Sequence, residues 1–578
     1  MLGGEAKMQP KQLIVLLLIV LLGFSVRVIN LQSTPPSLNW DEVSHGWNAY
    51  SILKTGQDEW GKTFPISNFR AYGDYPLPLN LYLTIPSIQL FGLSEFSLRF
   101  PHVLLGVGTI ISTFFLVQGL RFGPVVSLLS ALFVAIDPWT LFPSRAVFQS
   151  NLSIFFITAG FAFFFNREKH KVLLPISFFL LGLSVYSYHN SRIFMPLFLA
   201  IIFFIWKKEM LALWIGEKKI LVGSLIILLT FFIPLVAIFS SPDARARSRW
   251  VFLIDDGAIN KIIEQRQLSQ FSPPVTKLIY NKYTYFASEF SKNYVGYISA
   301  RFLFFEGGTQ YQFSVPGKGL LYPINVFFFY AGIFLVILGA FRRKKEHLTI
   351  FAWALIGLIP ASITTGDNHV IRSTTVLPLP QIFTALGAFV VWNWLKDRLR
   401  LFHKSLLPIF KLSYFVILAL MVISYLSLYF GEYREKYSWS WQYGYKEAID
   451  YAKSHYGEYN QIIVTKKYGE PHEFFLFYWP WDTIKYQRDP NLLRFYQSGW
   501  YWVDRFDKFY FVNDWEVPKN SNEKWKMERG GEFEIRGNAL LITSPENYPG
   551  EWNLMETINF LDGKPAFSIL ERNVGNYP

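Results

Sequence analysis

The stretch Leu38-Asn39-Trp40-Asp41-Glu42 places two adjacent carboxylates shortly after the first long apolar run of the chain. That run, at 12–31, is long enough to cross a bilayer, and no small-residue cleavage site follows it, so we expect an uncleaved first span. Carboxylates at a membrane surface cost free energy unless they are paired or used. The Asp41-Glu42 pair is therefore a candidate functional feature of the chain.

The composition is that of a polytopic membrane protein. Hydrophobic residues make up 51% of the 578 residues and charged residues only 17%, and the apolar residues occur in long blocks. The net charge of +13 comes mostly from short basic clusters between these blocks, so it does not indicate nucleic-acid binding. Cysteine is absent, which excludes disulfides, thiolate metal sites and a cysteine nucleophile.

Basic clusters between the apolar segments predict the topology. By the positive-inside rule each cluster is cytoplasmic, so an even number of spans must separate one from the next. This holds only if the short, proline-containing segment 77–92 lies at the outer interface instead of crossing. We therefore expect about eleven spans. The clusters are Lys7/Lys11, Arg167–Lys171, Lys207–Lys219, Arg342–Lys345 and Lys396–Lys404, and the spans are 12–31, 97–118, 124–143, 148–165, 172–188, 193–206, 220–240, 321–341, 348–365, 374–395 and 407–430.

This topology predicts a plasma-membrane protein with a cytoplasmic N-terminus and its reactive groups on the outer face. We expect a transmembrane catalytic domain at 1–431, with an outer loop at 32–96 and a large one at 241–320. The more polar tail, 432–578, is expected to be a small extracytoplasmic α/β domain, since helical and strand patterns alternate along it. The predicted helices are 445–455 and 471–478, and the predicted strands are 461–465, 509–513 and 539–543.

Asp41 and Glu42 fit two interpretations. Neighbouring side chains on a loop or helix start point apart, so one carboxylate could deprotonate a hydroxyl while the other orients a partner or binds a cation. Alternatively, both are first-turn acids of a helix that begins here.

The residues that follow resemble a known family. Gly73-Asp74-Tyr75-Pro76-Leu77-Pro78 and Gly92-Leu93-Ser94-Glu95, with Arg99 and Pro101 after them, accompany an Asp-Glu pair early in the first outer loop. In this the sequence resembles the bacterial members of the protein-O-mannosyltransferase and aminoarabinose-transferase group (glycosyltransferase family 39, GT-C fold) over roughly residues 10–400.

The resemblance implies eleven to thirteen spans with interfacial helices in the first outer loop. It also implies a polyprenyl-phosphate-linked sugar donor, reaction outside the cytoplasm and inversion at the anomeric carbon. In such enzymes the Asp of the pair is the proposed base, which corresponds to Asp41 here, with Glu42 as its neighbour.

Such a donor leaves as an anionic polyprenyl phosphate, so its site needs cations near the bilayer surface. Arginine suits this role because its guanidinium donates two aligned hydrogen bonds, although a lone arginine at a span end can also be a simple anchor. The candidates for phosphate binding are Arg145, Arg372, Arg192 and Arg301. Possible substrate or metal contacts are His189, His369, Glu306, Asp74 and Tyr75.

The alternative role of His189 and His369 is to hold a divalent metal together with Asp41, Glu42 or Glu306, although no local pair such as His-x-x-x-His supports it. We predict an inverting glycosyltransferase that moves a sugar from a polyprenyl-phosphate donor to a hydroxyl of a protein, glycan or lipid. A lipid-linked oligosaccharide polymerase or ligase is the alternative, because loop 241–320 is large and basic. A transporter fits less well, because the spans carry few charged residues at mid-membrane.

Overall fold

The computed structural model describes residues 9–73, 75–239, 251–366, 369–399, 406–520 and 523–572. The chain forms two compact units: unit 1 is Met1–Ile29 with His102–Leu426, and unit 2 is Asn30–Pro101 with Ser427–Pro578. The predicted boundary at residue 431 lies close to the start of the second segment of unit 2. The first outer loop, however, belongs to the same compact unit as the tail. The sequence had predicted that the loop and the tail belong to different domains.

Unit 1 is helical, and each of the eleven predicted spans contains at least one helix. Helix α4 begins in unit 2 and α20 ends there. The helices are α1 (Pro10–Val28), α4 (Glu95–Gly119), α5 (Pro124–Ile136), α6 (Pro138–Leu141), η1 (Phe142–Arg145), α7 (Gln149–Phe165), α8 (Leu173–Ser184), α9 (His189–Ile205), α10 (Lys207–Gly216), α11 (Lys218–Phe239), α16 (Val326–Phe341), α17 (Lys345–Gly357), α18 (Ile359–Ser362), α19 (Leu379–Leu399) and α20 (Leu406–Leu428), with short turns η3 (Pro323–Asn325) and η4 (Arg372–Val376).

Five of the described helical segments are long and apolar enough to cross a membrane, which makes the chain an integral membrane protein. They contain α1, α4, α11, α16 and α20. A sixth candidate is α5 followed by α6 and η1, which bend by 64° at the Asp137-Pro138 step. The count of about eleven spans is not confirmed, because helices such as α7, α8 and α9 are apolar but only 10–17 residues long.

The helices of unit 1 pack closely through buried polar caps and small residues. Arg27 of α1 donates hydrogen bonds to the carbonyls of Val134 (2.9 Å) and Ala135 (2.7 Å) at the end of α5, and α1 packs on α5. Gly332 of α16 and Gly387 of α19 lie against each other's helix backbone, where a Cβ would approach a carbonyl oxygen to 1.9 Å. Such small-residue contacts let membrane helices approach closely.

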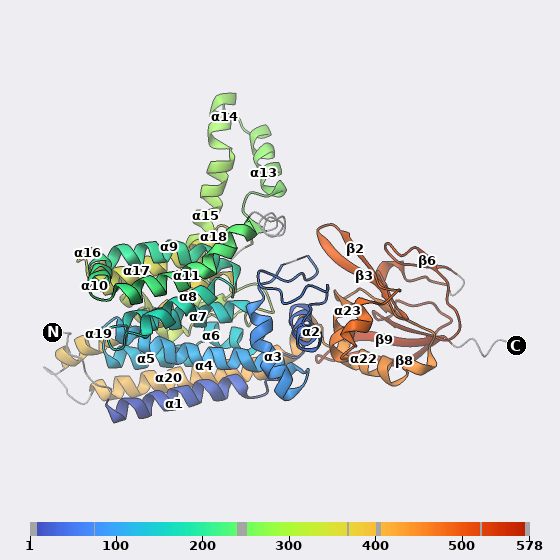
Figure 1. Ribbon diagram of the computed structural model, residues 1–578, viewed down its shortest axis with the longest axis horizontal. Coiled ribbons are helices and arrows are strands. Elements are labelled where there is room, and N and C mark those ends of the chain that lie inside the picture. The colour runs from blue at the N-terminus through green and yellow to red at the C-terminus, as the bar shows by residue number, and fades with distance from the viewer. Residues whose placement is uncertain are drawn as a thin grey trace. The chain divides into compact units, whose positions relative to one another are not determined.

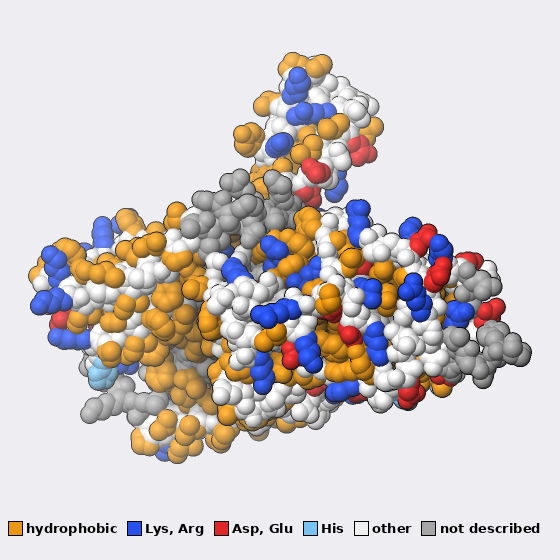
Figure 2. Space-filling model, turned by 45° about the vertical axis from the view of Figure 1, so that its right-hand side comes forward, with side chains coloured by type: hydrophobic (Ala, Val, Ile, Leu, Met, Phe, Trp, Pro, Cys, Tyr) orange, Lys and Arg blue, Asp and Glu red, His pale blue; other side chains and the backbone are white. Residues whose placement is uncertain are grey.

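On the face drawn in Figure 2, many hydrophobic side chains gather over the helical part of the protein. On α1, for example, Leu18 and Leu21 are each 60% exposed. Exposing this much apolar side-chain surface to water costs free energy, so the surface fits a lipid environment.

The large loop at 241–320 contains three helices of its own, α13 (Asp256–Gln267), α14 (Pro273–Ile279) and α15 (Lys282–Ile298), followed by the π-helical turn η2 (Arg301–Glu306). Helices α13 and α14 extend away from the helical bundle of unit 1 (Figure 1). Asn281 starts α15 because its side chain accepts hydrogen bonds from the backbone of Tyr283 and Thr284.

The first part of unit 2 contains α2 (Trp40–Thr55) and α3 (Leu79–Phe91), which pack on each other. Helix α3 has 13 residues, fewer than the roughly 20 that a bilayer crossing requires. Its length agrees with the prediction that 77–92 does not cross the membrane, although its orientation to the bilayer stays a prediction.

The second part of unit 2 is a layered α/β domain. Its seven-stranded sheet has the order β2-β3-β4-β1-β7-β9-β8, and the central β1 is parallel to both β4 and β7. The strands are β1 (Gln461–Thr465), β2 (Leu493–Gln497), β3 (Trp500–Phe506), β4 (Phe509–Val512), β7 (Ala539–Thr543), β8 (Asn553–Asn559) and β9 (Pro565–Arg572), with a separate pair β5 (Trp525–Lys526) and β6 (Glu532–Phe533).

Both faces of this sheet are covered. Helix α23 (Pro471–Tyr478) packs Phe475 against Phe509 and Phe511, while Trp525 and Tyr510 belong to the hydrophobic cluster that covers the other face. The remaining helices are α22 (Tyr445–Ser454) and α24 (Thr483–Gln487), with short turns η5 (Tyr429–Tyr433), α21 (Arg434–Lys436), η6 (Ser438–Trp441), η7 (Tyr456–Glu458) and η8 (Asp514–Glu516). The five elements predicted in the tail are all present.

Candidate active site around Asp41

The stretch Leu38-Asn39-Trp40-Asp41-Glu42 contains the start of helix α2. Asn39 is its N-cap: Asn39 Oδ1 accepts a hydrogen bond from the Glu42 amide (3.0 Å), and Glu42 Oε2 accepts one from the Asn39 amide (3.2 Å). This reciprocal capping box satisfies two amides that the helix leaves open, and acids in the first turn favour the helix dipole. Asp41 and Glu42 are thus first-turn acids, as one of the two sequence interpretations expected.

Glu42 points into the protein and pairs with Arg99. Arg99 Nε and Nη2 donate to the two carboxylate oxygens of Glu42 at 3.0 and 2.9 Å, and both side chains are almost fully buried. The remaining guanidinium protons go to the carbonyls of Leu31, Pro35 and Ser37, so all five donors of Arg99 are used. This pair anchors the chain that leads into α2.

Asp41 is half-buried, and its carboxylate has a different neighbour. The phenol of Tyr72 donates a hydrogen bond to Asp41 Oδ1 at 2.6 Å, and His45 Nδ1 lies 2.7 Å from the Asp41 carbonyl oxygen. Burial, and then the charge of Asp41, raise the pKa of Tyr72 well above its usual value near 10. Tyr72 therefore stays protonated as a donor to the Asp41 carboxylate at physiological pH.

Aromatic side chains from both parts of unit 2 surround this hydrogen bond. Tyr72 stacks on Trp500 of β3 with ring centroids 5.2 Å apart, and Trp40 meets Tyr72 edge-on at 6.4 Å. Gly73 allows the close approach: it has φ +129°, and a Cβ there would lie 2.5 Å from the Trp500 ring. Trp40 is fixed in turn, because its amide donates to Gln442 Oε1 at 2.9 Å.

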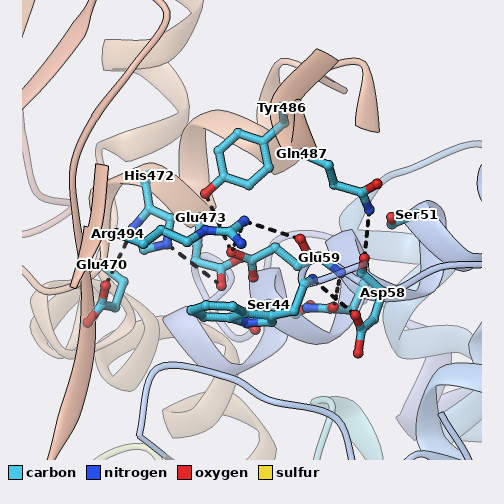
Figure 3. A network of polar contacts seen from close by, with 12 residues as sticks. Ser44, Ser51, Asp58, Glu59, Glu470, His472, Glu473, Tyr486, Gln487 and Arg494 are labelled. Atoms are coloured by element: carbon cyan, nitrogen blue, oxygen red, sulfur yellow. Dashed lines mark hydrogen bonds and ion pairs between the residues drawn. The ribbon is translucent and has the colours of Figure 1, made fainter. Parts of the chain in front are cut away.

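A second polar cluster (Figure 3) is joined to Trp500 by a hydrogen bond. The Trp500 indole donates to Glu470, whose other oxygen lies 3.4 Å from His472 Nδ1. Burial raises the pKa of Glu470 to about 8 and lowers that of His472 well below 6.5. Next to them, Arg494 donates to Glu59 Oε1 at 3.2 Å.

The predicted phosphate-binding arginines belong to unit 1, whereas Asp41 and Glu42 belong to unit 2. Arg145 is fully buried and donates to the carbonyls of Val26 (2.9 Å), Arg27 (2.7 Å) and Ile29 (2.7 Å), which caps the end of α1. Arg301 forms an exposed ion pair with Glu306 at 2.6 Å. Arg192 and Arg372 also have partners: Arg192 Nε donates to the Val185 carbonyl at 3.1 Å, and Arg372 Nη1 donates to the Thr365 carbonyl at 2.6 Å.

Arg192 and Arg372 are half-buried, and their segments touch. The Asn190 side chain, in the first turn of α9, donates to the Arg372 carbonyl at 2.6 Å. His369 lies on the same turn as Arg372, with its ring 5.0 Å from that of Phe313. The structure thus brings two of the four predicted arginines into one neighbourhood, beside the predicted contacts His189 and His369.

The remaining predicted contacts are placed only in part. Tyr75 is half-exposed in the loop after Tyr72, and Asp74 lies outside the described residues. Neither Tyr72 nor Gln442 was predicted as a site residue. A tyrosine two residues before Asp74 was visible, but its pairing with Asp41 depends on the three-dimensional fold.

Comparisons with known proteins give a family and several distant structural neighbours. A model of the dolichyl-phosphate-mannose-protein mannosyltransferase family matches residues 74–238. No curated protein matches the sequence significantly. The archaeal oligosaccharyltransferase AglB from Archaeoglobus fulgidus, in complex with an inhibitory peptide and a dolichol-phosphate, is 15% identical with a TM-score of 0.48; the match covers 81% of this chain but only 63% of AglB, less than two thirds of its length.

Two further solved structures are similar at comparable levels. ArnT from Cupriavidus metallidurans, bound to undecaprenyl phosphate, is 13% identical over 97% of this chain and 98% of ArnT, with a TM-score of 0.49. The Pmt1-Pmt2 complex of S. cerevisiae, bound to the sugar donor, is 18% identical over 40% of this chain and 34% of that one, with a TM-score of 0.31.

The family match begins at Asp74, one residue inside the Gly73–Pro78 motif, includes the Gly92–Pro101 segment with Arg99, and ends within α11. The Asp41-Glu42 pair lies before it. The predicted resemblance to this glycosyltransferase group is confirmed, since residues 74–238 match the dolichyl-phosphate-mannose-protein mannosyltransferase family.

Proposed function

We propose that the protein is an inverting glycosyltransferase that moves a sugar from a polyprenyl-phosphate-linked donor to a hydroxyl acceptor at the outer face of the membrane. The observation that carries this proposal is that Asp41 and Glu42 have different partners and different burial. Glu42 is used in the buried pair with Arg99, whereas the Asp41 carboxylate is half-buried and hydrogen-bonded to a protonated tyrosine. A partly accessible, oriented carboxylate is what a general base requires.

In the proposed reaction, Asp41 takes the proton of the acceptor hydroxyl as its oxygen attacks the anomeric carbon. The bond between the anomeric carbon and the phosphate oxygen breaks, and the electron pair leaves with the polyprenyl phosphate. Attack from the face opposite the leaving group inverts the configuration. The ring of Trp40, which is only half-buried, offers an apolar face near the carboxylate, on which a sugar ring can stack.

We propose Arg192 and Arg372 as the groups that bind the donor phosphate. Both are half-buried and lie on segments joined by the Asn190 hydrogen bond. A guanidinium can donate two aligned bonds to a phosphate and stabilise its growing charge. Arg145 ranks below them because it is fully buried against three carbonyls, and Arg301 ranks below them because Glu306 already balances its charge.

The test is transfer by the full-length protein in detergent or proteoliposomes, followed as release of polyprenyl phosphate from a polyprenyl-phosphate hexose. Asp41→Asn should lower the rate by at least about 100-fold, the usual contribution of a general base. Its thermal unfolding should stay close to that of the wild type, because Asp41 is only half-buried. Near-normal turnover by Asp41→Asn would show that this carboxylate is not the base.

A further inference from the structure

The second polar cluster of unit 2 joins two segments that are far apart in sequence (Figure 3). Glu59 lies in the turn that follows α2, while His472 and Glu473 lie in the first turn of α23. All three are at most 4% exposed. Their potential ligand atoms, one from each side chain, lie within 4.8 Å of one another.

The turn that carries Glu59 is held in place by several hydrogen bonds. Asn48 Oδ1 accepts from the Glu59 amide at 2.9 Å, and Gln487 Nε2 donates to the Asp58 carbonyl at 2.7 Å. Tyr486 donates to Glu59 Oε1 at 3.4 Å. A preorganised carboxylate of this kind is a better ligand than one on a mobile loop.

The charges in the cluster do not balance. Glu59, Glu470 and Glu473 are three buried carboxylates, and Arg494 pairs with Glu59 at 3.2 Å. Lys466, which also lies nearby, forms its own ion pair with Asp504 at 2.7 Å. Burying excess negative charge is costly unless a cation or protons compensate it.

One oxygen of the cluster also lacks a partner. Glu473 Oε2 is buried and accepts no hydrogen bond from any residue that the structure describes. The other oxygen, Oε1, lies 4.0 Å from His472 Nε2. Burial, and then the charge of Glu59, raise the pKa of Glu473 well above 4.5, so a proton offsets this cost when no cation is bound. A bound divalent cation would take the place of that proton.

His472 is oriented as metal-binding histidines usually are. Its Nδ1 faces Glu470 at 3.4 Å, which leaves Nε2 directed toward Glu473. A carboxylate behind the imidazole fixes the tautomer and strengthens the ligand, and Arg494 supports Glu59 in the same way from behind.

We propose that Glu59, His472 and Glu473 bind one divalent transition-metal ion, which fastens the turn after α2 to helix α23. One imidazole nitrogen and two carboxylates form a mixed donor set that suits Zn²⁺ or Mn²⁺. Three protein ligands leave coordination positions for water. Binding draws the donor atoms together from their present spacing, to roughly 3.3 Å apart around a tetrahedral zinc. The site is separate from the Asp41 carboxylate, so the proposal does not depend on the proposed transferase activity.

The test uses the full-length protein in detergent, purified without a polyhistidine tag and stripped with EDTA. The protein is then equilibrated with Zn²⁺ or Mn²⁺, desalted and analysed by mass spectrometry for bound metal. We expect one equivalent per chain and a higher unfolding temperature in the presence of the metal. The isosteric Glu473→Gln should lose at least about tenfold in metal affinity, as should His472→Ala, while Glu473→Asp should retain part of it.

The matched control is Glu556→Gln, an exposed carboxylate on β8 of the same unit, which should bind metal like the wild type. The metal-dependent rise in unfolding temperature should be lost in Glu473→Gln even though this variant stays folded. A wild type that retains no stoichiometric Zn²⁺ or Mn²⁺ would overturn the proposal. Equal metal retention by wild type, Glu473→Gln and His472→Ala would do the same, since it would place the ion elsewhere.

Discussion

Tyr72 donates its phenol hydrogen to Asp41 Oδ1 over 2.6 Å, so a buried residue holds the half-buried carboxylate at the start of α2. The pKa of Tyr72 is raised well above 10, first by burial and then by the charge of Asp41. Tyr72 therefore remains a neutral donor over the whole range in which the protein would be assayed. Its hydrogen bond favours the ionised form of Asp41 over the protonated form.

Tyr72→Phe should therefore slow transfer by about tenfold, the order expected for a hydrogen bond to a charged group. Without this donor, the ionised form of Asp41 loses stabilisation relative to its protonated form. The acidic limb of the pH profile should therefore move to higher pH. The measurement is kcat/KM for the lipid-linked donor between pH 5 and 9. Tyr82→Phe is the matched control, because it removes a 2.9 Å hydrogen bond to the Pro65 carbonyl in the same unit. A Tyr72→Phe profile that coincides with the wild type would contradict the role of this phenol.

The Glu42–Arg99 pair should affect stability more than chemistry. Both side chains are almost fully buried, and Glu42→Gln leaves the Arg99 guanidinium without its counter-charge. Removing one partner of a buried ion pair costs about 3–5 kcal/mol of unfolding free energy, which corresponds to roughly 10 °C for a unit of this size. Thermal unfolding in detergent measures this effect.

The double variant Glu42→Gln/Arg99→Met should be less destabilised than the sum of its single variants, because no charge is left uncompensated. Asp41→Asn provides the comparison, since it changes the adjacent carboxylate without touching the pair. If Glu42→Gln unfolds at the wild-type temperature but loses transfer, Glu42 acts in the reaction instead.

Gly73 should be required for the contact between Tyr72 and Trp500. An alanine there would be strained at φ +129°, and its Cβ would lie 2.5 Å from the Trp500 ring and 2.9 Å from the Gly499 carbonyl oxygen. Gly73→Ala should displace Trp500 and lower both transfer and unfolding temperature. Fluorescence of the tryptophans together with the transfer rate would follow this change.

Gly92→Ala separates backbone strain from crowding. Gly92 also has a positive φ of +75°, but no atom lies within 4 Å of a Cβ built there. It should therefore lower the unfolding temperature slightly and leave transfer unchanged. If both alanine variants behaved alike, the crowding against Trp500 would have no functional role.

Local patterns predicted the elements of this protein well. Apolar runs gave the helices of unit 1, and alternating helix and strand patterns gave α22, β1, α23, β4 and β7. Strand β3, in contrast, reads as the aromatic run Trp500-Tyr501-Trp502 followed by charged residues, and β8 alternates weakly, so neither was predicted. The number of spans was harder, because several apolar helices are shorter than a bilayer crossing and their role depends on tertiary packing.

The site was predictable only where residues adjacent in sequence act together. The Asp-Glu pair after the first span singled out Asp41 and Glu42, but their opposite surroundings follow from Tyr72 and Arg99, 31 and 57 positions away. The tail was predicted to be a separate domain, so the stacking of Trp500 on Tyr72 was not predicted. Such long-range contacts leave no periodic signal in the sequence.

Arg372 and Arg192 should govern the affinity for the lipid-linked donor. Their segments meet through the hydrogen bond from Asn190 to the Arg372 carbonyl. Both arginines are half-buried, so part of each side chain remains accessible to a ligand. Replacing either arginine by lysine keeps the charge but loses the forked pair of donors that matches a phosphate. We expect Arg372→Lys and Arg192→Lys to raise KM for the donor at least about fivefold, and to lower kcat where the lost bonds stabilise the leaving phosphate. Arg301→Lys is the matched control, because the Arg301 side chain is 78% exposed and paired with Glu306, so the kinetics of this variant should stay within about twofold of the wild type. Steady-state kinetics at several donor concentrations would measure all three variants, and a large effect of Arg301→Lys with none at Arg372 would assign the phosphate to the loop before α16 instead.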